Sequence, residues 1–202
     1  DTTARTISIP TELLYPTPVY TEQVNKLGII QQEIDSAIDQ VEFKNFKDTH
    51  LISEDSFRGD VISQYNLNTL KQEIDFHLSK YCRDLKFRTN TPWKQLEYTF
   101  QSSWFTKQEK GHYARMHSHG ISDISGVYYY QTSGEDGHFE LNCPNVVMEA
   151  TQCYQHIAMT TVCVPKVGML KLFPSWLYHG IRTNTTDDTR ISLSFNIEFK
   201  PE

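Results

Sequence analysis

The feature that most constrains the fold is a change in hydrophobic period after Pro92. Beyond this residue, apolar residues recur at every second position in short segments, which is the pattern of strands with one buried face. We expect eight strands, over residues 95–106, 112–117, 124–131, 137–142, 156–164, 169–174, 177–183 and 190–199. Turn residues separate these segments, and no helical pattern lies between them. Eight short strands in this arrangement indicate an antiparallel sandwich or jelly roll.

The part of the chain before Pro92 has a helical period instead. Apolar residues fall at three- and four-residue steps over 22–41 and again over 66–87, which predicts two amphipathic helices. Residues 8–20 contain three prolines and predict an extended segment that packs against the core. Residues 42–63 show no period and predict an irregular connection.

These patterns predict a two-part organisation within one structural unit. Residues 1–92 form an N-terminal part, with an extended segment and two helices that support the core. Residues 93–202 form the β core. The predicted fold class is mostly β with flanking helices, the helical layer being packed on one sheet.

The last predicted strand has the most regular alternation in the chain. Its apolar residues point one way and its polar residues the other: Ile191, Leu193, Phe195, Ile197 and Phe199 against Arg190, Ser192, Ser194, Asn196 and Glu198. Arg190 shares a face with Ser192, and an arginine there needs an anion, a water-filled cleft or open solvent. The preceding segment 183–188 is rich in hydroxyl and carboxylate groups, which predicts a surface turn.

Two histidines mark a candidate metal site. His117 and His119 are two residues apart at the end of a predicted strand, so both imidazoles lie on one face. Such a pair can chelate a transition metal, because imidazole suits iron, copper, zinc and nickel alike. Jelly rolls place open metal sites inside the barrel, and His179 on a late strand is positioned as a third ligand.

Composition narrows the classes of partner. The net charge is -6 and there is no basic run, so we expect no nucleic-acid partner. No apolar run approaches the roughly 18 residues that span a bilayer, so we expect no membrane partner. Cys82, Cys143, Cys153 and Cys163 lie far apart without CxxC spacing, which favours reduced thiols and a cytoplasmic protein. A homodimer is an arrangement that the sequence allows.

Three runs carry a resemblance to a known family. HSHGISDISGVYYYQ from His117, GMLKLFPSWLYHGIRTN from Gly168 and TRISLSFNIEF from Thr189, in this order and spacing, resemble a family of 2-oxoglutarate- and Fe(II)-dependent oxygenases common in bacteria and phages. The resemblance covers about residues 96–199. It implies a double-stranded β-helix, which is a cupin-like jelly roll, and a dioxygenase that uses Fe(II), 2-oxoglutarate and O2. Hydroxylation of a small-molecule or peptidyl substrate, with release of succinate and CO2, is the implied reaction.

The resemblance also implies roles for individual residues. His117 matches the first metal ligand and His179 the distal one. Arg190 matches the arginine that grips the far carboxylate of 2-oxoglutarate, and Ser192 completes an RxS pattern in which the hydroxyl shares that carboxylate. Arginine suits this task because its planar fork pairs bidentately with a carboxylate.

The chain departs from the family pattern at one ligand. The superfamily has Asp or Glu two residues after the first histidine, whereas this chain has His119. Either three histidines hold the metal, or Asp123 supplies the carboxylate from a loop that folds back. We prefer His119, because its spacing needs no special loop geometry. In a third arrangement the position takes solvent or a halide, as in related halogenases.

Tyrosines of the 124–131 strand are candidate cosubstrate contacts. Tyr128 and Tyr130 share a face and could hydrogen-bond 2-oxoglutarate, whereas Tyr129 faces the other way. Two other functional classes stay open. One is a cupin-like metal protein, such as a cosubstrate-free dioxygenase or an isomerase, for which Arg190 is not required. The other is a non-catalytic jelly roll that binds carbohydrate or protein.

Overall fold

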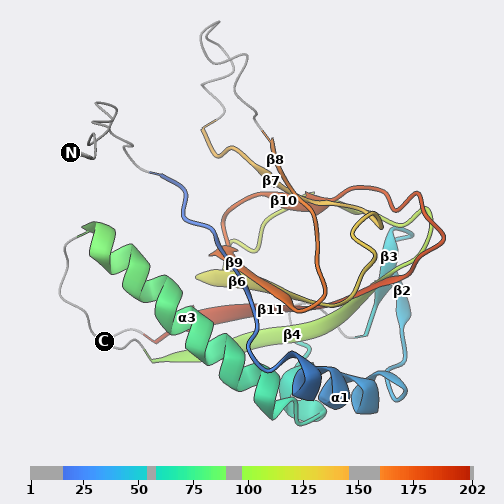
Figure 1. Cartoon of the computed structure of the whole chain (residues 1–202). Helices are drawn as coiled ribbons and strands as arrows, with labels where there is room; N and C mark the ends of the chain where they lie inside the picture. The colour runs from blue at the N-terminus through green and yellow to red at the C-terminus, as the bar shows by residue number, and fades with distance from the viewer. Residues whose placement is uncertain (1–15, 54–57, 90–96, 146–159, 201–202) are drawn as a thin grey trace, which may run out of the picture.

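The computed structural model describes residues 16–53, 58–89, 97–145 and 160–200. Two antiparallel sheets face one another, and the helices lie against the larger one (Figure 1). The elements in chain order are β1 (Tyr20–Gln23), α1 (Leu27–Ile38), β2 (Lys44–Phe46), β3 (His50–Ile52), α2 (Val61–Gln64), α3 (Asn68–Thr89), β4 (Tyr98–Gln108), β5 (Ala114–His117), β6 (Ile124–Gln131), β7 (Phe139–Asn142), β8 (Thr160–Cys163), β9 (Met169–Pro174), β10 (His179–Ile181) and β11 (Arg190–Phe199). None of the described helices is both long and apolar enough to cross a membrane.

The two sheets have the topology of a jelly roll. The larger has seven strands in the order β1-β9-β6-β11-β4-β3-β2, and the smaller has four in the order β5-β10-β7-β8. Several neighbours in space are distant in sequence, such as β6 and β9 or β4 and β11, whereas β2, β3 and β4 follow one another both in sequence and in the sheet. The mostly β fold with a helical layer on one sheet is therefore confirmed.

The strand predictions hold best where the strands are central. β6, β9 and β11 have the predicted bounds, whereas β5 and β10 are shorter than predicted. Residues 95–96 and 156–159 of two predicted strands, and 8–15 of the extended segment, lie outside the described residues. The division of the chain at residue 92 stays a prediction.

The irregular connection predicted for 42–63 is wrong in part. It contains β2, β3 and the short helix α2, and β3 pairs with β4 of the larger sheet. Each of these strands has only three residues, which is too short to show a hydrophobic period. They form because β4 offers an edge to pair with, and the sequence pattern of 42–63 does not contain that information.

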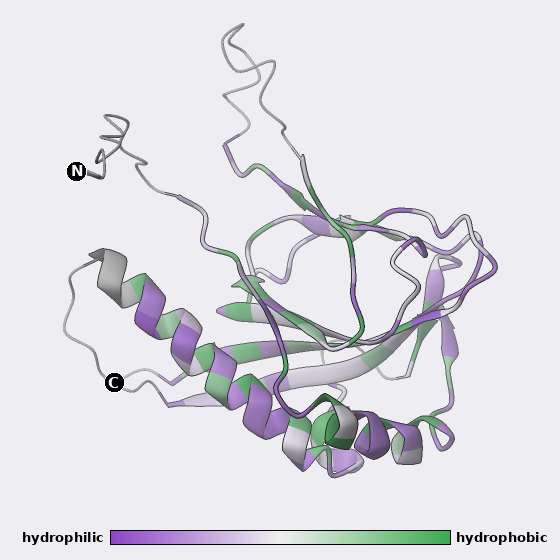
Figure 2. Cartoon of the chain, in the orientation of Figure 1, coloured by the Kyte–Doolittle hydropathy of each residue, from purple (hydrophilic) through white to green (hydrophobic). Residues whose placement is uncertain are grey.

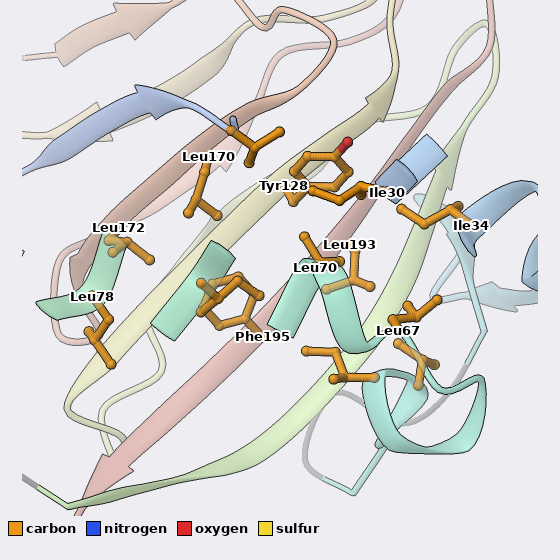
Figure 3. Packing of buried hydrophobic residues seen from close by; sticks show 14 of the residues in the cluster. Ile30, Ile34, Leu67, Leu70, Leu78, Tyr128, Leu170, Leu172, Leu193 and Phe195 are labelled. Carbon is orange, nitrogen blue, oxygen red and sulfur yellow. The ribbon is translucent and has the colours of Figure 1, made fainter. Parts of the chain in front are cut away.

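The main core lies between the helices and the larger sheet. Ile30 and Ile34 from α1, and Leu70 from α3, pack over Leu193 and Phe195 of β11 (Figure 3). All five are fully buried. Hydrophobic and hydrophilic residues alternate along α3, as expected of a helix with one buried face (Figure 2). The apolar face of β11 is thus the face that holds the helical layer.

The polar face of β11 is also buried, on the inner side of the barrel. Ser192 and Asn196 are each 2% exposed. The Ser125 hydroxyl lies 2.8 Å from Asn196 Oδ1, and Asn196 Nδ2 donates to Ser102 Oγ at 3.2 Å. The alternation in the sequence therefore separates an apolar core from a polar interior, rather than a core from solvent.

Candidate active site

Three histidines come together at one end of the barrel interior. His117 ends β5, His119 lies in the loop that follows, and His179 begins β10. β10 pairs with β5 so that His179 is directly opposite His117. One ligand nitrogen from each of the three lies within 4.8 Å of the others. The three residues predicted from spacing are therefore within reach of a single ion.

Hydrogen bonds to carbonyl groups fix the tautomers of two of these rings. His117 Nδ1 lies 2.7 Å from the Arg115 carbonyl oxygen, and His179 Nδ1 lies 2.9 Å from that of Leu177. Because a carbonyl oxygen only accepts, each Nδ1 carries the proton and donates. Nε2 of both rings is left with its lone pair, which is the form that binds a metal.

Backbone hydrogen bonds hold the loop that carries His119. The His119 amide donates to the Ser175 carbonyl at 2.8 Å, and the Ser175 amide donates to the Asp123 carbonyl at 3.0 Å. The turn that begins at Ser175, directly after β9, is thus tied to the loop after β5. This tie explains how a residue beyond the strand end still lies beside the other two histidines.

Burial favours the neutral form of two of these rings, His119 and His179. Burial, together with the nearby His117, lowers the pKa of His179 to about 3 and that of His119 to about 4. A neutral imidazole is the ligand form, so His119 and His179 need no deprotonation to accept a metal. Three imidazole nitrogens are a donor set that fits a divalent transition metal.

Asp123 does not lie with the histidines. Its carboxylate accepts from the Phe199 amide at 2.7 Å, at the end of β11. Within the described ranges, the group that could hold a metal consists of His117, His119 and His179. The alternative in which Asp123 replaces His119 would require that loop to rearrange.

A cavity of about 410 Å³ extends from the histidines into the barrel. Both sheets line it, with Phe173 and Phe139 beside His179, and Ser192 and Tyr129 among the lining residues of β11 and β6. Pockets of this size hold small-molecule ligands. The aromatic rings near the histidines exclude water from that part of the cavity.

The tyrosine prediction is wrong and needs correction. Tyr128 lies in the core under the helices, and the Tyr130 hydroxyl donates to Asp35 of α1. Tyr129, which was predicted to face away, lines the cavity. Alternation identifies which residues share a face but not which face turns inward. The register does: Tyr129 is the cross-strand partner of Ser192, and partners lie on the same side of a sheet.

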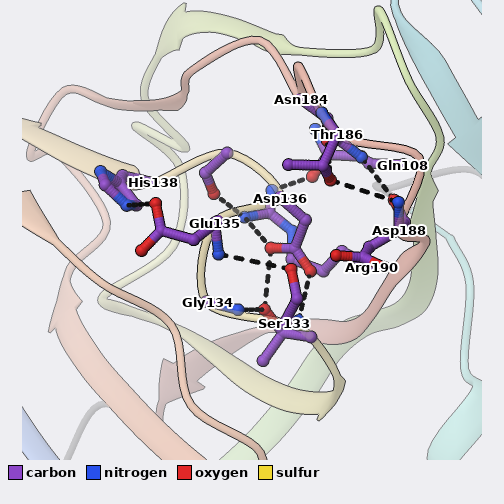
Figure 4. Close-up of polar contacts among 12 residues, drawn as sticks. Gln108, Ser133, Gly134, Glu135, Asp136, His138, Asn184, Thr186, Asp188 and Arg190 are labelled. Atoms are coloured by element: carbon purple, nitrogen blue, oxygen red, sulfur yellow. Dashed lines mark hydrogen bonds and ion pairs between the residues drawn. The ribbon is translucent and has the colours of Figure 1, made fainter.

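Arg190 is buried beside the cavity, in a polar cluster (Figure 4). Its two terminal nitrogens donate to the Gly137 carbonyl and to Gln108 Oε1. Asp136, which is 0% exposed, lies 4.0 Å from Nη1. The Asp136 carboxylate also accepts from the Thr132 hydroxyl and the Ser133 amide, both at 2.8 Å. The arginine thus finds its anion within the protein, and it is not one of the residues that line the cavity.

Three buried polar atoms in this region have no hydrogen-bond partner within the described ranges. They are Tyr129 Oη, Arg190 Nε and Gln108 Nε2. Burial raises the pKa of Tyr129, so its hydroxyl stays protonated as a donor. Burial lowers the pKa of Arg190, and Tyr129 and Asp136 oppose that shift. Unsatisfied donors are costly in a protein interior, so this group fits an acceptor such as a carboxylate.

A family model decides the identity of this core. Residues 102–196, which span β4 to most of β11, match the family described as "Putative 2OG-Fe(II) oxygenase". These residues belong to the 2OG-Fe(II) oxygenase family. The family uses Fe(II) and 2-oxoglutarate, and the histidine cluster and the donor group fit a metal and a carboxylate respectively. No curated protein matches the sequence.

Solved structures share the fold of this chain at low identity. HygX of Streptomyces hygroscopicus, with nickel and 2-oxoglutarate bound, is 11% identical over 90% of this chain and 83% of its own, with a TM-score of 0.60. A prolyl-4-hydroxylase of Pseudomonas putida is 15% identical over 92% and 94%, with a TM-score of 0.54. The epimerase SnoN from nogalamycin biosynthesis is 10% identical over 90% and 77%, with a TM-score of 0.61. These neighbours perform different reactions, so the shared fold leaves the outcome of the oxygenase reaction open.

Proposed function

We propose that the protein is a Fe(II)- and 2-oxoglutarate-dependent dioxygenase that hydroxylates a small-molecule or peptidyl substrate. His117, His119 and His179 would hold the metal. Ser192 and Tyr129 would hold the far carboxylate of 2-oxoglutarate, and Arg190 would supply positive charge behind them. When bound, Fe(II) and 2-oxoglutarate let O2 oxidise a substrate C–H bond to C–OH, while 2-oxoglutarate is converted to succinate and CO2.

The observation that carries this proposal is that the metal-binding nitrogens and the hydrogen-bond donors lie at one cavity. Three histidine nitrogens that can converge on one ion lie at a cavity that is also lined by Ser192 and Tyr129. A chelating keto acid needs a metal at one end. At the other end it needs hydrogen-bond donors for its free carboxylate. A metal protein that works without a cosubstrate has no need of the second group.

The residues of the chain have separate tasks in this scheme. The Arg115 and Leu177 carbonyls orient the His117 and His179 rings, because each accepts a ring N–H. Tyr129 and Ser192 supply neutral hydroxyl donors to the carboxylate. Arg190 supplies positive charge from behind them, and Phe139 and Phe173 exclude water from the reacting end.

The proposal is tested by the optical spectrum of the protein with Fe(II) under anaerobic conditions. Addition of 2-oxoglutarate should give a weak visible charge-transfer band, because the keto acid chelates the metal. His179→Ala should abolish the band. Asp187→Asn, an exposed substitution, is the control and should keep it. Absence of the band in the unmodified protein would rule out the proposed function.

A further inference from the structure

The charges that line the cavity are unbalanced. Its walls contain two cations, Lys47 and Arg115, and no aspartate or glutamate among the described residues that line it. The chain as a whole is acidic, with 25 Asp and Glu against 19 Lys and Arg. The cavity therefore has the opposite sign to the molecule, and such a site attracts anions.

Arg115 is placed beside the metal cluster by strand alternation. It lies two residues before His117 on β5, so the two side chains share a face, and both line the cavity. Arg115 is exposed, and within the described residues its side chain makes no ion pair. A guanidinium in this setting has its full set of donors available for a ligand.

Lys47 reaches the cavity from the other sheet, on the turn between β2 and β3. These strands stand at the edge of the larger sheet beyond β4 (Figure 1). The Lys47 ammonium lies 5.0 Å from the centroid of the Phe46 ring, which also lines the cavity. This contact gives the flexible lysine a preferred position at the wall.

The backbone of this turn is unfavourable for lysine. Lys47 and Asp48 have φ values of 54° and 55°, the region that turns of this kind fill with glycine or asparagine. Asp48 suits the turn, since its backbone N–H and its carboxylate both bond to the Asn45 side chain, at 2.8 and 3.2 Å. The turn thus separates the two charges, with Asp48 held by Asn45 and Lys47 left at the cavity. Strained positions of this sort often lie at ligand-binding sites.

We propose that the substrate of this oxygenase carries an oxyanion, either a carboxylate or a phosphate, which Arg115 and Lys47 bind. This inference rests on the proposed function and names the class of substrate. The two cations lie on β5 and the β2–β3 turn, whereas the proposed 2-oxoglutarate donors Ser192 and Tyr129 lie on β11 and β6. Phe46 and Trp104 among the lining residues offer an aromatic surface to the rest of the substrate.

The test uses the full chain loaded with Zn(II) and 2-oxoglutarate. The probes are benzoate, phenyl phosphate and neutral benzamide, and ligand-observed NMR gives the dissociation constant of each. At least one acid should bind about tenfold more tightly than benzamide, as a charged hydrogen bond would provide. The stronger of the two acids identifies the oxyanion.

Three variants locate the binding. Arg115→Gln and Lys47→Gln should each weaken the binding of the acid about tenfold and leave the affinity for benzamide unchanged. Lys44→Gln is the matched control, because it removes the same charge from the same hairpin at a position outside the cavity. The affinity for 2-oxoglutarate should be the same in all of them.

Three results would overturn the proposal. They are binding of neither acid, binding of benzamide as tight as that of the acids, and acid affinity that Arg115→Gln and Lys47→Gln leave intact. A loss of 2-oxoglutarate affinity with unchanged acid affinity would assign the two cations to the cosubstrate. Failure of the unmodified protein to bind 2-oxoglutarate is a different result, and it would count against the proposed function itself.

Discussion

At the residue scale, the proposed metal site differs from the family pattern in charge. His119 stands where the superfamily has a carboxylate, so the three ligands bring no negative charge to a divalent ion. The ion would keep its full positive charge until an anionic ligand such as 2-oxoglutarate binds. A site of this kind gains more from an acidic cosubstrate than a site with a carboxylate ligand does.

The ligand assignment predicts different effects for two neighbouring substitutions. His119→Ala should lose most of the bound Fe(II), because it removes one of three donors, whereas Asp123→Ala should keep it. The difference is measured as the metal content of each variant after it is loaded with Fe(II) and separated from unbound metal by gel filtration. The reverse result would place the carboxylate of Asp123 on the metal.

Tyr129 and Tyr128 provide a matched pair for the cosubstrate. Both hydroxyls are buried without a partner within the described ranges, but Tyr129 lines the cavity and Tyr128 lies under the helices. Tyr129→Phe should weaken 2-oxoglutarate binding about tenfold, as expected for loss of a hydrogen bond to a charged group. Tyr128→Phe should leave it unchanged. Isothermal titration calorimetry with Ni(II)-loaded protein measures both, and equal affinities in the two variants would remove Tyr129 from the carboxylate site.

At the element scale, the loop between β6 and β7 holds the start of β11 in place. It carries Asp136, which is fully buried and lies beside Arg190. The loop also has two glycines with positive φ, Gly134 and Gly137. A Cβ at Gly137 would collide with the Arg182 carbonyl, so the loop fits closely against the segment that follows β10. Arg190 is thereby held by two elements, this loop and β4, whose Gln108 accepts from it.

Removal of the buried carboxylate should therefore be costly. Asp136→Asn leaves Arg190 without its anion, and loss of one partner of a buried pair lowers the free energy of unfolding by about 3 kcal/mol. Asp187→Asn is the control, because Asp187 pairs with Lys110 at 2.9 Å on the exposed surface and should cost less than about 1 kcal/mol. Urea unfolding measures both. Equal stability of the two variants would mean that Asp136 does not balance the arginine.

Some strands and contacts could be predicted from the sequence, and others depend on pairing between distant strands. Long central strands were predictable because β11 and β6 have enough residues to show a period. The three histidines were predictable because spacing and order identify them. The inward face of β6 was not, since it depends on the pairing of Tyr129 with Ser192 across strands. The partners of Arg190 were hidden for the same reason, because Asp136 and Gln108 reach it from other elements.

At the scale of the whole molecule, the site connects the two sheets. His117 and His179 belong to the smaller sheet, and Ser192 and Tyr129 to the larger. A metal and a cosubstrate bound between them would link the sheets across the cavity. Ligand binding should consequently stabilise the fold as a whole, because the unfolded chain has no such arrangement.

This linkage predicts a shift in thermal unfolding. Ni(II) and 2-oxoglutarate together, at about 100 times the dissociation constant, should add about 2.7 kcal/mol to the free energy of unfolding. His179→Ala should remove most of that gain, whatever its own stability in the absence of ligand. Thermal melts with and without the ligands measure the gain in each protein. A gain of the same size in His179→Ala would place the binding elsewhere.

β11 separates the helical layer from the cavity by the thickness of a single strand. Odd-numbered positions such as Ile191 and Leu193 lie in the core with the helices, and even-numbered ones such as Ser192 and Ser194 line the cavity. In a library of single substitutions along this strand, variants at odd-numbered and at even-numbered positions would lose activity for different reasons. Variants at odd-numbered positions would disrupt the core, and the folded protein would not accumulate. Even-numbered variants would accumulate and fail only in an assay for ligand binding.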